Sequence, residues 1–156
     1  MPSGAERRLP PIQKEVLVKI SPQRAFDVFT KGIATWWPLS RHSVFLENSA
    51  SCSIEPRVGG EIREVAKDGS YGVWGTVLAW EPPRRFVMKW HPGSSPSQHT
   101  EVEVRFVAVA GGTRVVLEHR DWENLGARAE TTRGNYDNGW VDVFERCFVE
   151  ACATEA

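Results

Sequence analysis

The chain has 156 residues, of which 19 are basic and 20 acidic, so its formal net charge is only -1. A chain of this length forms a single domain and buries about 70% of the surface that its unfolded form exposes. Because no run of like charges extends beyond Arg84 and Arg85, the charge pattern favours neither nucleic acid nor a membrane surface as a partner.

We expect a flexible segment over residues 1–12 and one domain over residues 13–156. The N-terminal residues carry charge without an apolar stretch behind them, unlike a signal peptide, and no apolar run reaches the ~20 residues of a membrane span. The cysteines, Cys52, Cys147 and Cys152, are odd in number and lack metal-ligand spacing, which argues against a disulfide framework and structural zinc. The sequence therefore predicts a cytoplasmic protein with free thiols, no metal and no cofactor.

The domain begins with a strand and a short helix. Apolar residues recur at every second position in Val16, Val18 and Ile20, which is the period of a strand. Ser21 is a good N-cap and Pro22 fits the first helical turn, so a helix is expected to begin there. Its apolar side consists of Ala25, Phe26, Phe29 and Ile33. The segment ends between Gly32 and Pro38, and Leu39–Ser51 is predicted to be a loop.

Turn-forming residues then recur about every ten positions, which predicts a meander of antiparallel hairpins. The clearest alternation is in Glu101–Phe106, where apolar side chains face one way and charged ones the other, so one face of the sheet is expected to be wet. With the first strand, the predicted strands number seven, the other six being Cys52–Pro56, Glu61–Ala66, Val73–Trp80, Phe86–His91, Glu101–Val109 and Thr113–His119.

A long C-terminal helix is expected to cover the other face of the sheet. Its apolar residues recur at helical spacing, and burying each large one contributes on the order of 1.5 to 3 kcal/mol. They are Tyr136, Trp140, Val143, Phe144, Cys147, Phe148 and Ala151.

Four runs of residues carry a family resemblance. They are Val16–Trp37, Gly75–Val77 with Pro82, Pro83 and Trp90, Gly112 and Thr113 leading to His119, and Gly139 with Trp140. In this order they resemble the subfamily similar to the activator of heat shock protein 90 ATPase, within the SRPBCC superfamily of START and birch-pollen-allergen-like domains. The resemblance implies an α+β helix-grip fold: a seven-stranded antiparallel sheet curved around a long C-terminal helix, two short helices after the first strand, and a cavity between sheet and helix.

Two polar side chains and one glycine are candidates for the wall of that cavity. His119 shares a strand face with Val115 and Leu117, so it is expected to point inward, either as a satisfied core histidine or as a hydrogen-bonding group at the pocket mouth. Tyr136 on the helix is either packed in the core or in contact with a ligand. Gly139 lies on the apolar flank of the helix, where it permits close packing or leaves space for a ligand.

The seven tryptophans supply the remaining candidates. Trp90 is placed on the inner face, and of Trp36 and Trp37 at the rim, one is expected to pack and the other to line the pocket. If Val73 and Val77 face the core, Trp74 and Trp80 lie on the outer surface, which suggests a homodimer or partner patch. The full set of predicted ligand-binding residues is Trp36, Trp37, Trp90, His119, Tyr136, Trp140 and Phe144.

The sequence shows little catalytic chemistry. It lacks the serine-hydrolase, zinc-protease and phosphate-loop motifs. A charged cluster of Glu55, Arg57, Glu61, Arg63 and Glu64 is interpreted as a solvated cross-strand ion-pair face, the alternative being an acid/base set that would need burial. Residues 91–99 are expected to form a hairpin loop, either a lid or a simple connection.

Three functional hypotheses follow. The first is non-enzymatic binding of a hydrophobic, aromatic or lipid-like small molecule in the cavity. The second is a cyclase or hydrolase of the polyketide cyclase type, with His119 and Tyr136 transferring protons. The third, implied by the subfamily's name, is a chaperone-binding module with a role in the stress response, which ranks last because that name records similarity to one domain of a larger activator.

Overall fold

The computed structural model describes residues 8–155. Its strands form one antiparallel sheet of seven, in the order β1-β7-β6-β5-β4-β3-β2, which confirms the predicted sheet. Of the segment predicted to be flexible, residues 1–7 lie outside the described residues, and Ile12 already belongs to the first strand. The strands are β1 (Ile12–Val18), β2 (Ser49–Ile54), β3 (Glu61–Ala66), β4 (Tyr71–Glu81), β5 (Arg85–Trp90), β6 (Thr100–Val109) and β7 (Gly112–Arg120).

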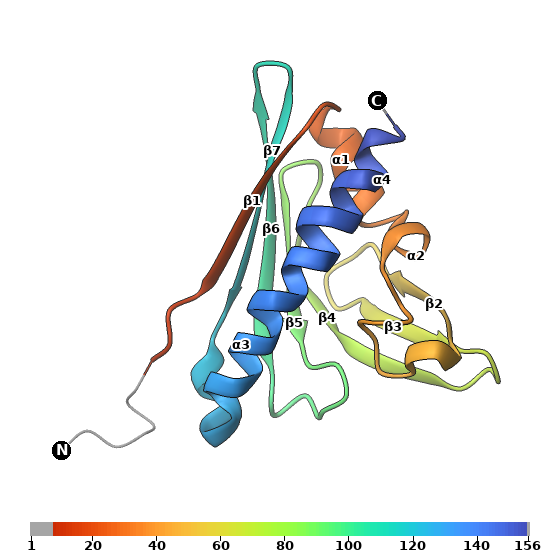
Figure 1. Ribbon diagram of the computed structural model, residues 1–156, viewed down its shortest axis with the longest axis vertical. Coiled ribbons are helices and arrows are strands. Elements are labelled where there is room, and N and C mark those ends of the chain that lie inside the picture. The colour runs from red at the N-terminus through yellow and green to blue at the C-terminus, as the bar shows by residue number, and fades with distance from the viewer. Residues whose placement is uncertain (1–7, 156) are drawn as a thin grey trace.

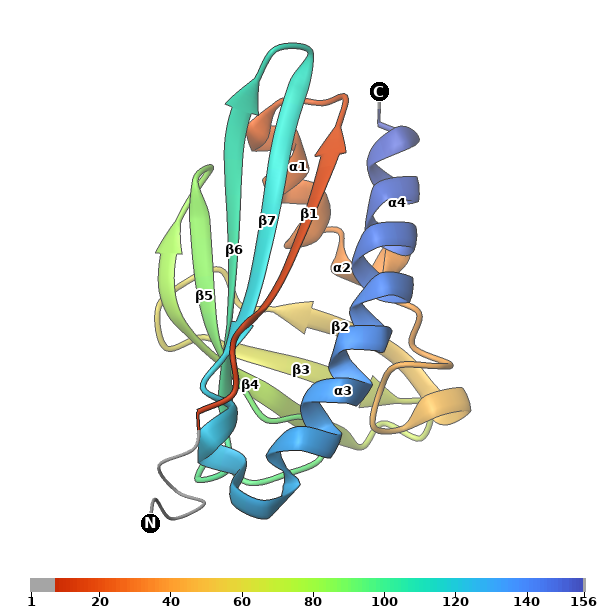
Figure 2. The same cartoon turned by 60° about the vertical axis from the view of Figure 1, so that its left-hand side comes forward.

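Two short helices follow β1, and a long helical segment ends the chain and runs across the sheet (Figure 1). The sheet is strongly twisted, since β2 and β3 run across the direction of β6 and β7 and the C-terminal helix lies within the curve (Figure 2). The helices are α1 (Pro22–Phe29), α2 (Ile33–Trp36), the short 3-10 helices η2 (Leu46–Asn48) and η3 (Trp122–Arg128), and then α3 (Ala129–Trp140), the π-helical η4 (Val141–Phe148) and α4 (Val149–Ala153).

Local sequence explains where these elements begin. The Ser21 hydroxyl accepts a hydrogen bond from the backbone N–H of Arg24 at 3.2 Å, and Pro22 occupies the first turn, so α1 starts at the predicted cap. In β6, Val102, Val104 and Phe106 are buried while the residues between them are more exposed, which confirms the predicted alternation.

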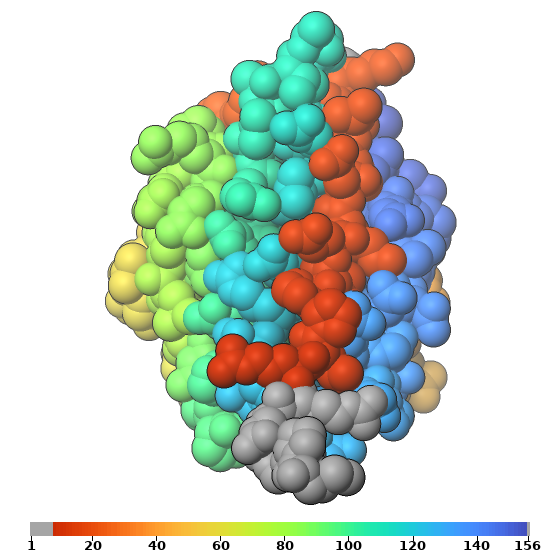
Figure 3. All heavy atoms as spheres, turned by 90° about the vertical axis from the view of Figure 1, so that its left-hand side faces the viewer, coloured from red at the N-terminus to blue at the C-terminus, as the bar shows by residue number. Residues whose placement is uncertain are grey.

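Strands β1, β7, β6 and β5 lie side by side on the face of the molecule shown in Figure 3, and charged side chains pair across this outer face of the sheet. The Arg120 guanidinium lies 2.6 Å from Glu103 and 3.1 Å from Glu101, and Arg85 lies 2.8 Å from Glu103. These cross-strand pairs lie on strands β5, β6 and β7, which are neighbours in the sheet. The prediction of one wet face is therefore confirmed.

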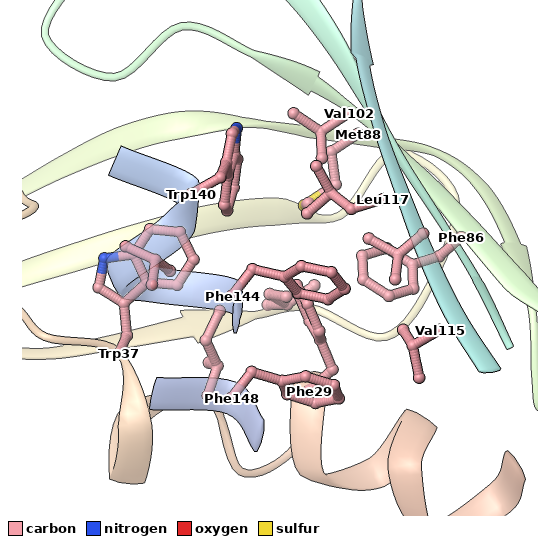
Figure 4. Close-up of a cluster of buried hydrophobic side chains, with 14 of the residues drawn as sticks. Phe29, Trp37, Phe86, Met88, Val102, Val115, Leu117, Trp140, Phe144 and Phe148 are labelled. Carbon is pink, nitrogen blue, oxygen red and sulfur yellow. The ribbon is translucent and has the colours of Figure 1, made fainter. Parts of the chain in front are cut away.

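Aromatic side chains fill one half of the space between sheet and helix (Figure 4). Phe144 and Phe148 from the C-terminal helix stack with centroids 5.5 Å apart, and Phe29 from α1 lies 5.1 Å from Phe148 and 5.3 Å from Phe86 of the sheet. All four rings are completely buried. Burial of each contributes about 1.5 to 3 kcal/mol, which holds the predicted helix stripe on the sheet.

Strand β4 corrects one prediction, because Trp74 and Trp80 do not lie on the outer surface. Two register shifts interrupt this strand, one beside Ile62 of β3 and one between Val77 and Ala79. Each bulge adds a residue and reverses the face that later side chains occupy. Trp74 is consequently only 1% exposed and Trp80 packs on Phe26 at 5.1 Å, so the surface patch behind the homodimer prediction is absent.

Within residues 8–155 no helix is both long enough and apolar enough to cross a membrane. The three cysteines are free, as predicted. Cys52 and Cys152 are buried, and burial raises the pKa of each thiol to about 12, so both are inert packing groups at neutral pH.

Candidate functional site

A pocket of about 270 Å³, partly open to solvent, lies between the sheet and the first half of the C-terminal helix. The sheet supplies its floor from β4 and β5, the helix supplies one wall, and the loop after α2 supplies the rim. The lining residues are Trp37, His42, Ser43, Val44, Trp74, Trp90, Pro92, Asn135, Tyr136, Gly139, Trp140 and Val143.

Four tryptophans dominate this lining. The Trp37 ring lies with its centroid 5.2 Å from that of Trp74, 5.8 Å from Trp140 and 6.0 Å from Trp90. Trp74 and Trp90 are 5.6 Å apart. All four are more than nine-tenths buried, so their orientations are fixed by mutual packing. The pocket thus offers rigid indole faces and edges to whatever enters it.

Tyr136 supplies a hydroxyl to the same wall. Its oxygen accepts a hydrogen bond from the Trp90 indole N–H at 3.1 Å. Burial raises the pKa of the phenol, and the bond from Trp90 offsets this only in part. At neutral pH the hydroxyl is therefore protonated, and its own hydrogen can be donated to a ligand.

His119 points inward as predicted, yet it is not among the pocket-lining residues. The Trp140 indole N–H donates to its Nδ1 at 3.0 Å, so the ring proton is on Nε2, which lies 2.7 Å from the Thr100 hydroxyl. Burial lowers the pKa of His119 to about 3. His119 is therefore neutral and fully buried, and both of its ring nitrogens make hydrogen bonds. Through its Nδ1 it orients the Trp140 indole, which itself lines the pocket.

A second histidine, which the sequence analysis did not single out, does line the pocket. His42 Nε2 lies 2.9 Å from an oxygen of Asp142 on the helix. Arg41 binds the same carboxylate at 3.0 Å, and Arg146 binds it from one turn along the helix. The Arg41 guanidinium most of all, then Arg146 and His42, holds the pKa of Asp142 far below its usual range, against a partial burial that acts in the other direction.

Glu64 fixes the loop that carries His42. Its carboxylate is completely buried and accepts hydrogen bonds from the backbone N–H groups of Val44 at 2.9 Å and Phe45 at 3.1 Å, and from the Trp74 indole at 2.9 Å. Burial alone would raise the pKa of Glu64, but these hydrogen bonds and the nearby polar hydroxyls of Ser43 and Ser49 outweigh it and lower the pKa. An ionised carboxylate therefore joins the sheet to the pocket rim.

This arrangement corrects the interpretation of the charged cluster. Glu61 and Arg63 pair at 2.6 Å, and Glu55 and Arg57 at 3.3 Å, on the exposed face as expected. Glu64 does not join them, because it lies two residues after the buried Ile62, on the same inward face of β3. No group of three or more metal-ligating side chains occurs within the described part of the chain.

The protein-family model described as Activator of Hsp90 ATPase homolog 1-like protein matches residues 19–148. The chain belongs to this family. A comparison with curated proteins gave no match.

Solved structures place this member of the Activator of Hsp90 ATPase homolog 1-like family beside several relatives. Txn09, an anthrahydroquino-γ-pyrone synthase, is 34% identical, with 83% of this chain and 88% of that chain covered and a TM-score of 0.57. An AHSA1-like protein from Aeromonas hydrophila is 19% identical over 93% of each chain, with a TM-score of 0.66. CalU16 from Micromonospora echinospora is 20% identical over 96% of this chain and 83% of that chain, with a TM-score of 0.61.

In this AHSA1-like domain the predicted ligand-binding residues fall into two groups. Trp37, Trp90, Tyr136 and Trp140 line the pocket. Trp36, His119 and Phe144 do not: Trp36 donates its indole N–H to the Val28 carbonyl at 2.8 Å and packs on Phe148, so it is the packing member of the pair.

The residues missed by sequence reasoning are Trp74, His42 and Asp142. For Trp74, the prediction assumed regular alternation along β4 and therefore gave the wrong face, because the bulges interrupt that alternation. His42 lies in a loop without periodicity, and Asp142 lies on the polar side of the helix, 100 residues away in sequence. Only the tertiary structure brings these two together.

Proposed function

We propose that the protein binds a small, planar, largely apolar aromatic molecule in the tryptophan-lined pocket. The observation that carries this proposal is the set of four indoles packed around a partly open space of about 270 Å³. Ligand pockets are usually about 300 to 1,000 Å³ and mainly apolar with a few polar groups. At about 270 Å³ this pocket is just below that range, which suits a bicyclic or tricyclic ring system.

The polar groups in the wall restrict the ligand further. The Tyr136 hydroxyl offers a hydrogen-bond donor, which suits a carbonyl oxygen, and His42 offers a ring nitrogen. An aliphatic lipid would satisfy neither group and would gain little from flat indole faces. We therefore favour an oxygenated aromatic ligand over the lipid-like alternative.

Calorimetric titration with 2-methoxyanthraquinone tests the proposal. For a ligand of about 18 non-hydrogen atoms, roughly 0.3 kcal/mol per atom amounts to about 5 kcal/mol, a dissociation constant on the order of 0.1 mM. Val44→Trp should fill the pocket mouth from an exposed position and abolish binding, because Val44 lines the pocket yet is 44% exposed. Val58→Trp, at an exposed loop position outside the lining, is the matched control and should bind as the natural protein does. Equal binding by both variants would contradict the pocket assignment.

A second candidate is catalysis of ring closure on such a ligand. The observation that favours it is the 34% identity with Txn09, an anthrahydroquino-γ-pyrone synthase, over most of both chains. The test is to incubate the purified protein with an anthrahydroquinone that carries an open-chain γ-pyrone precursor and to follow the cyclised product by chromatography. A rate equal to that without protein would leave binding as the supported function. Chaperone binding stays a prediction, whose test is recovery of the chaperone in a pull-down with this protein.

A further inference from the structure

We propose that His42 and Asp142 form a proton-accepting pair in the pocket wall, which takes the proton of a phenolic hydroxyl on the bound aromatic ligand. The inference rests on the proposed function, because it needs an aromatic molecule in the pocket. The ligand's O–H bond breaks, an N–H bond forms at His42 Nδ1, and a phenolate remains opposite an imidazolium. The proton returns by the same path when the ligand leaves.

The first support is the tautomer that Asp142 imposes. A carboxylate accepts hydrogen bonds and donates none, so the 2.9 Å contact requires the proton of the neutral ring to be on Nε2. Nδ1 then carries the lone pair, and within residues 8–155 it makes no hydrogen bond. A neighbouring carboxylate also stabilises the imidazolium that forms when Nδ1 accepts a proton.

The second support is the position of that nitrogen. A Cβ atom built on Gly139 would lie 3.6 Å from His42 Cε1 and 3.7 Å from Nδ1. Both Gly139 and His42 line the pocket. The helix thus has no side chain at the point where it meets the basic edge of the imidazole, and this absence leaves room for a ligand atom beside Nδ1.

The third support is the charge around the pair. Arg41 and Arg146 both bind Asp142, so the carboxylate stays ionised and presents a negative charge to His42 Nε2. The other titratable groups around His42 are Cys147 and Tyr136 on the helical segment and Glu64 beneath the rim loop.

The chemical class of the ligand follows from the donor and the acceptor together. Tyr136 and Gly139 are three residues apart, so they lie on one face of α3 with Cβ positions about 5 to 6 Å apart. Tyr136 keeps its proton and donates, while Nδ1 accepts. A ring system with a carbonyl at one position and an acidic hydroxyl across the ring fits both, as in a hydroxyquinone or a hydroxyaryl ketone.

The experiment uses 2-hydroxyanthraquinone, whose phenol and phenolate differ in visible absorption, and its methyl ether, which has no proton to lose. The pKa of the bound phenol is read from absorption through the neutral pH range and compared with that of the free compound. An apolar pocket without a proton acceptor would raise this pKa, because burial disfavours the phenolate. We expect it to fall by about one unit, which means roughly tenfold tighter binding of the phenolate than of the phenol.

Three variants assign the effect to the pair. His42→Gln keeps an N–H donor near the position of Nε2 but lacks the basic nitrogen, so the lowered pKa should be lost. Asp142→Asn removes the charge that stabilises the imidazolium, so the lowering should shrink. His99→Gln changes a half-buried histidine outside the pocket lining and should match the natural protein with both ligands.

Three outcomes overturn the inference, and they are distinguishable from one another. If both ligands bind and the phenol's pKa is unchanged or raised, the proton-accepting pair is wrong while the binding function stands. If the lowered pKa persists in His42→Gln, another group accepts the proton. If the methyl ether does not bind the natural protein, the proposed function itself fails and this inference falls with it.

Discussion

Gly139→Ala separates stability from ligand recognition in one substitution. Alanine is favoured over glycine in a helix interior by roughly 0.8 to 1 kcal/mol. Gly139 lies within α3 without a left-handed φ, and the nearest atoms to its added Cβ are those of His42 at 3.6 and 3.7 Å, an ordinary van der Waals separation. The methyl group therefore fits, and we expect unfolding to require up to about 1 kcal/mol more.

The same methyl group should weaken recognition of a phenol. It would lie 3.7 Å from His42 Nδ1, on the side from which a ligand oxygen approaches. An O–H···N bond needs its heavy atoms about 2.7 to 3.0 Å apart, so the methyl group and the ligand oxygen compete for one space. We expect 2-hydroxyanthraquinone to lose about tenfold in affinity relative to its methyl ether.

Gly134→Ala is the matched control for this experiment. Gly134 lies in the same helix with nothing within 4 Å of an added Cβ, and it does not line the pocket. It should gain the same helix stability and bind both ligands as the natural protein does. Thermal denaturation measures the first effect, as a rise of about 2 to 4 °C per kcal/mol for a chain of this size, and calorimetric titration measures the second.

The two readouts refute different steps of the reasoning. A Gly139→Ala protein that melts below the natural protein would show that the methyl group does not fit against His42, contrary to the ordinary van der Waals separations found there. A variant that melts higher but keeps the natural ratio of phenol to ether affinity would show that Nδ1 does not meet the ligand hydroxyl.

Three further predictions concern stability. Glu64→Gln should lower the free energy of urea unfolding by about 2 kcal/mol, since hydrogen bonds to an ionised group contribute roughly 1.5 to 3 kcal/mol. Because folding lowers the pKa of Glu64, this contribution is present above the unfolded pKa of about 4.3 and is lost as pH falls through the folded pKa. The variant should not show this loss of stability at low pH. His119, with a folded pKa of about 3 against roughly 6.5 unfolded, should make stability fall by about 1.4 kcal/mol per pH unit below pH ~6, and His119→Asn should remove that slope. Gly75→Ala should prevent stable folding, as judged by circular dichroism, because its Cβ would lie 1.7 Å from the Lys89 carbonyl oxygen; a cooperative unfolding transition near that of the natural protein would contradict this.

The parts of the fold that could be predicted from sequence are those with a local physical cause. The Ser21 cap, the alternation of β6 and the apolar stripe of the C-terminal helix each depend on neighbouring residues and on a fixed period. The seven strands follow in the same way, because turn-forming residues separate them. Trp37, Trp90, Tyr136 and Trp140 were found for this reason: each lies on the inner side of a regular element or at its end.

The prediction of which side chains face inward failed where the two-residue alternation of a strand is interrupted. Two bulges in β4 add residues to the strand, so Trp74 turned inward although alternation from Val73 and Val77 placed it outside. Strand sequences carry no reliable mark of a bulge, since the extra residue depends on how the partner strand pairs. The one hint in the sequence was that both faces of β4 appeared apolar, which is also the pattern of a strand whose inward face changes along its length.

The pair of His42 and Asp142 lies beyond sequence reasoning for a related reason. Asp142 is at the start of the π-helical stretch Val141–Phe148, whose wider turn places Cys147, five residues on, beside it with 4.0 Å between sulfur and oxygen. A helix of 3.6 residues per turn would not align these two positions. The Glu64 carboxylate holds the facing loop by its backbone N–H groups, so no side-chain pattern in the loop records its position. The sequence around each partner therefore gives no sign of the pair, because His42 is a loop histidine and Asp142 a polar residue of a helix. The proposed proton acceptance depends on the contact between them, which only the folded chain provides.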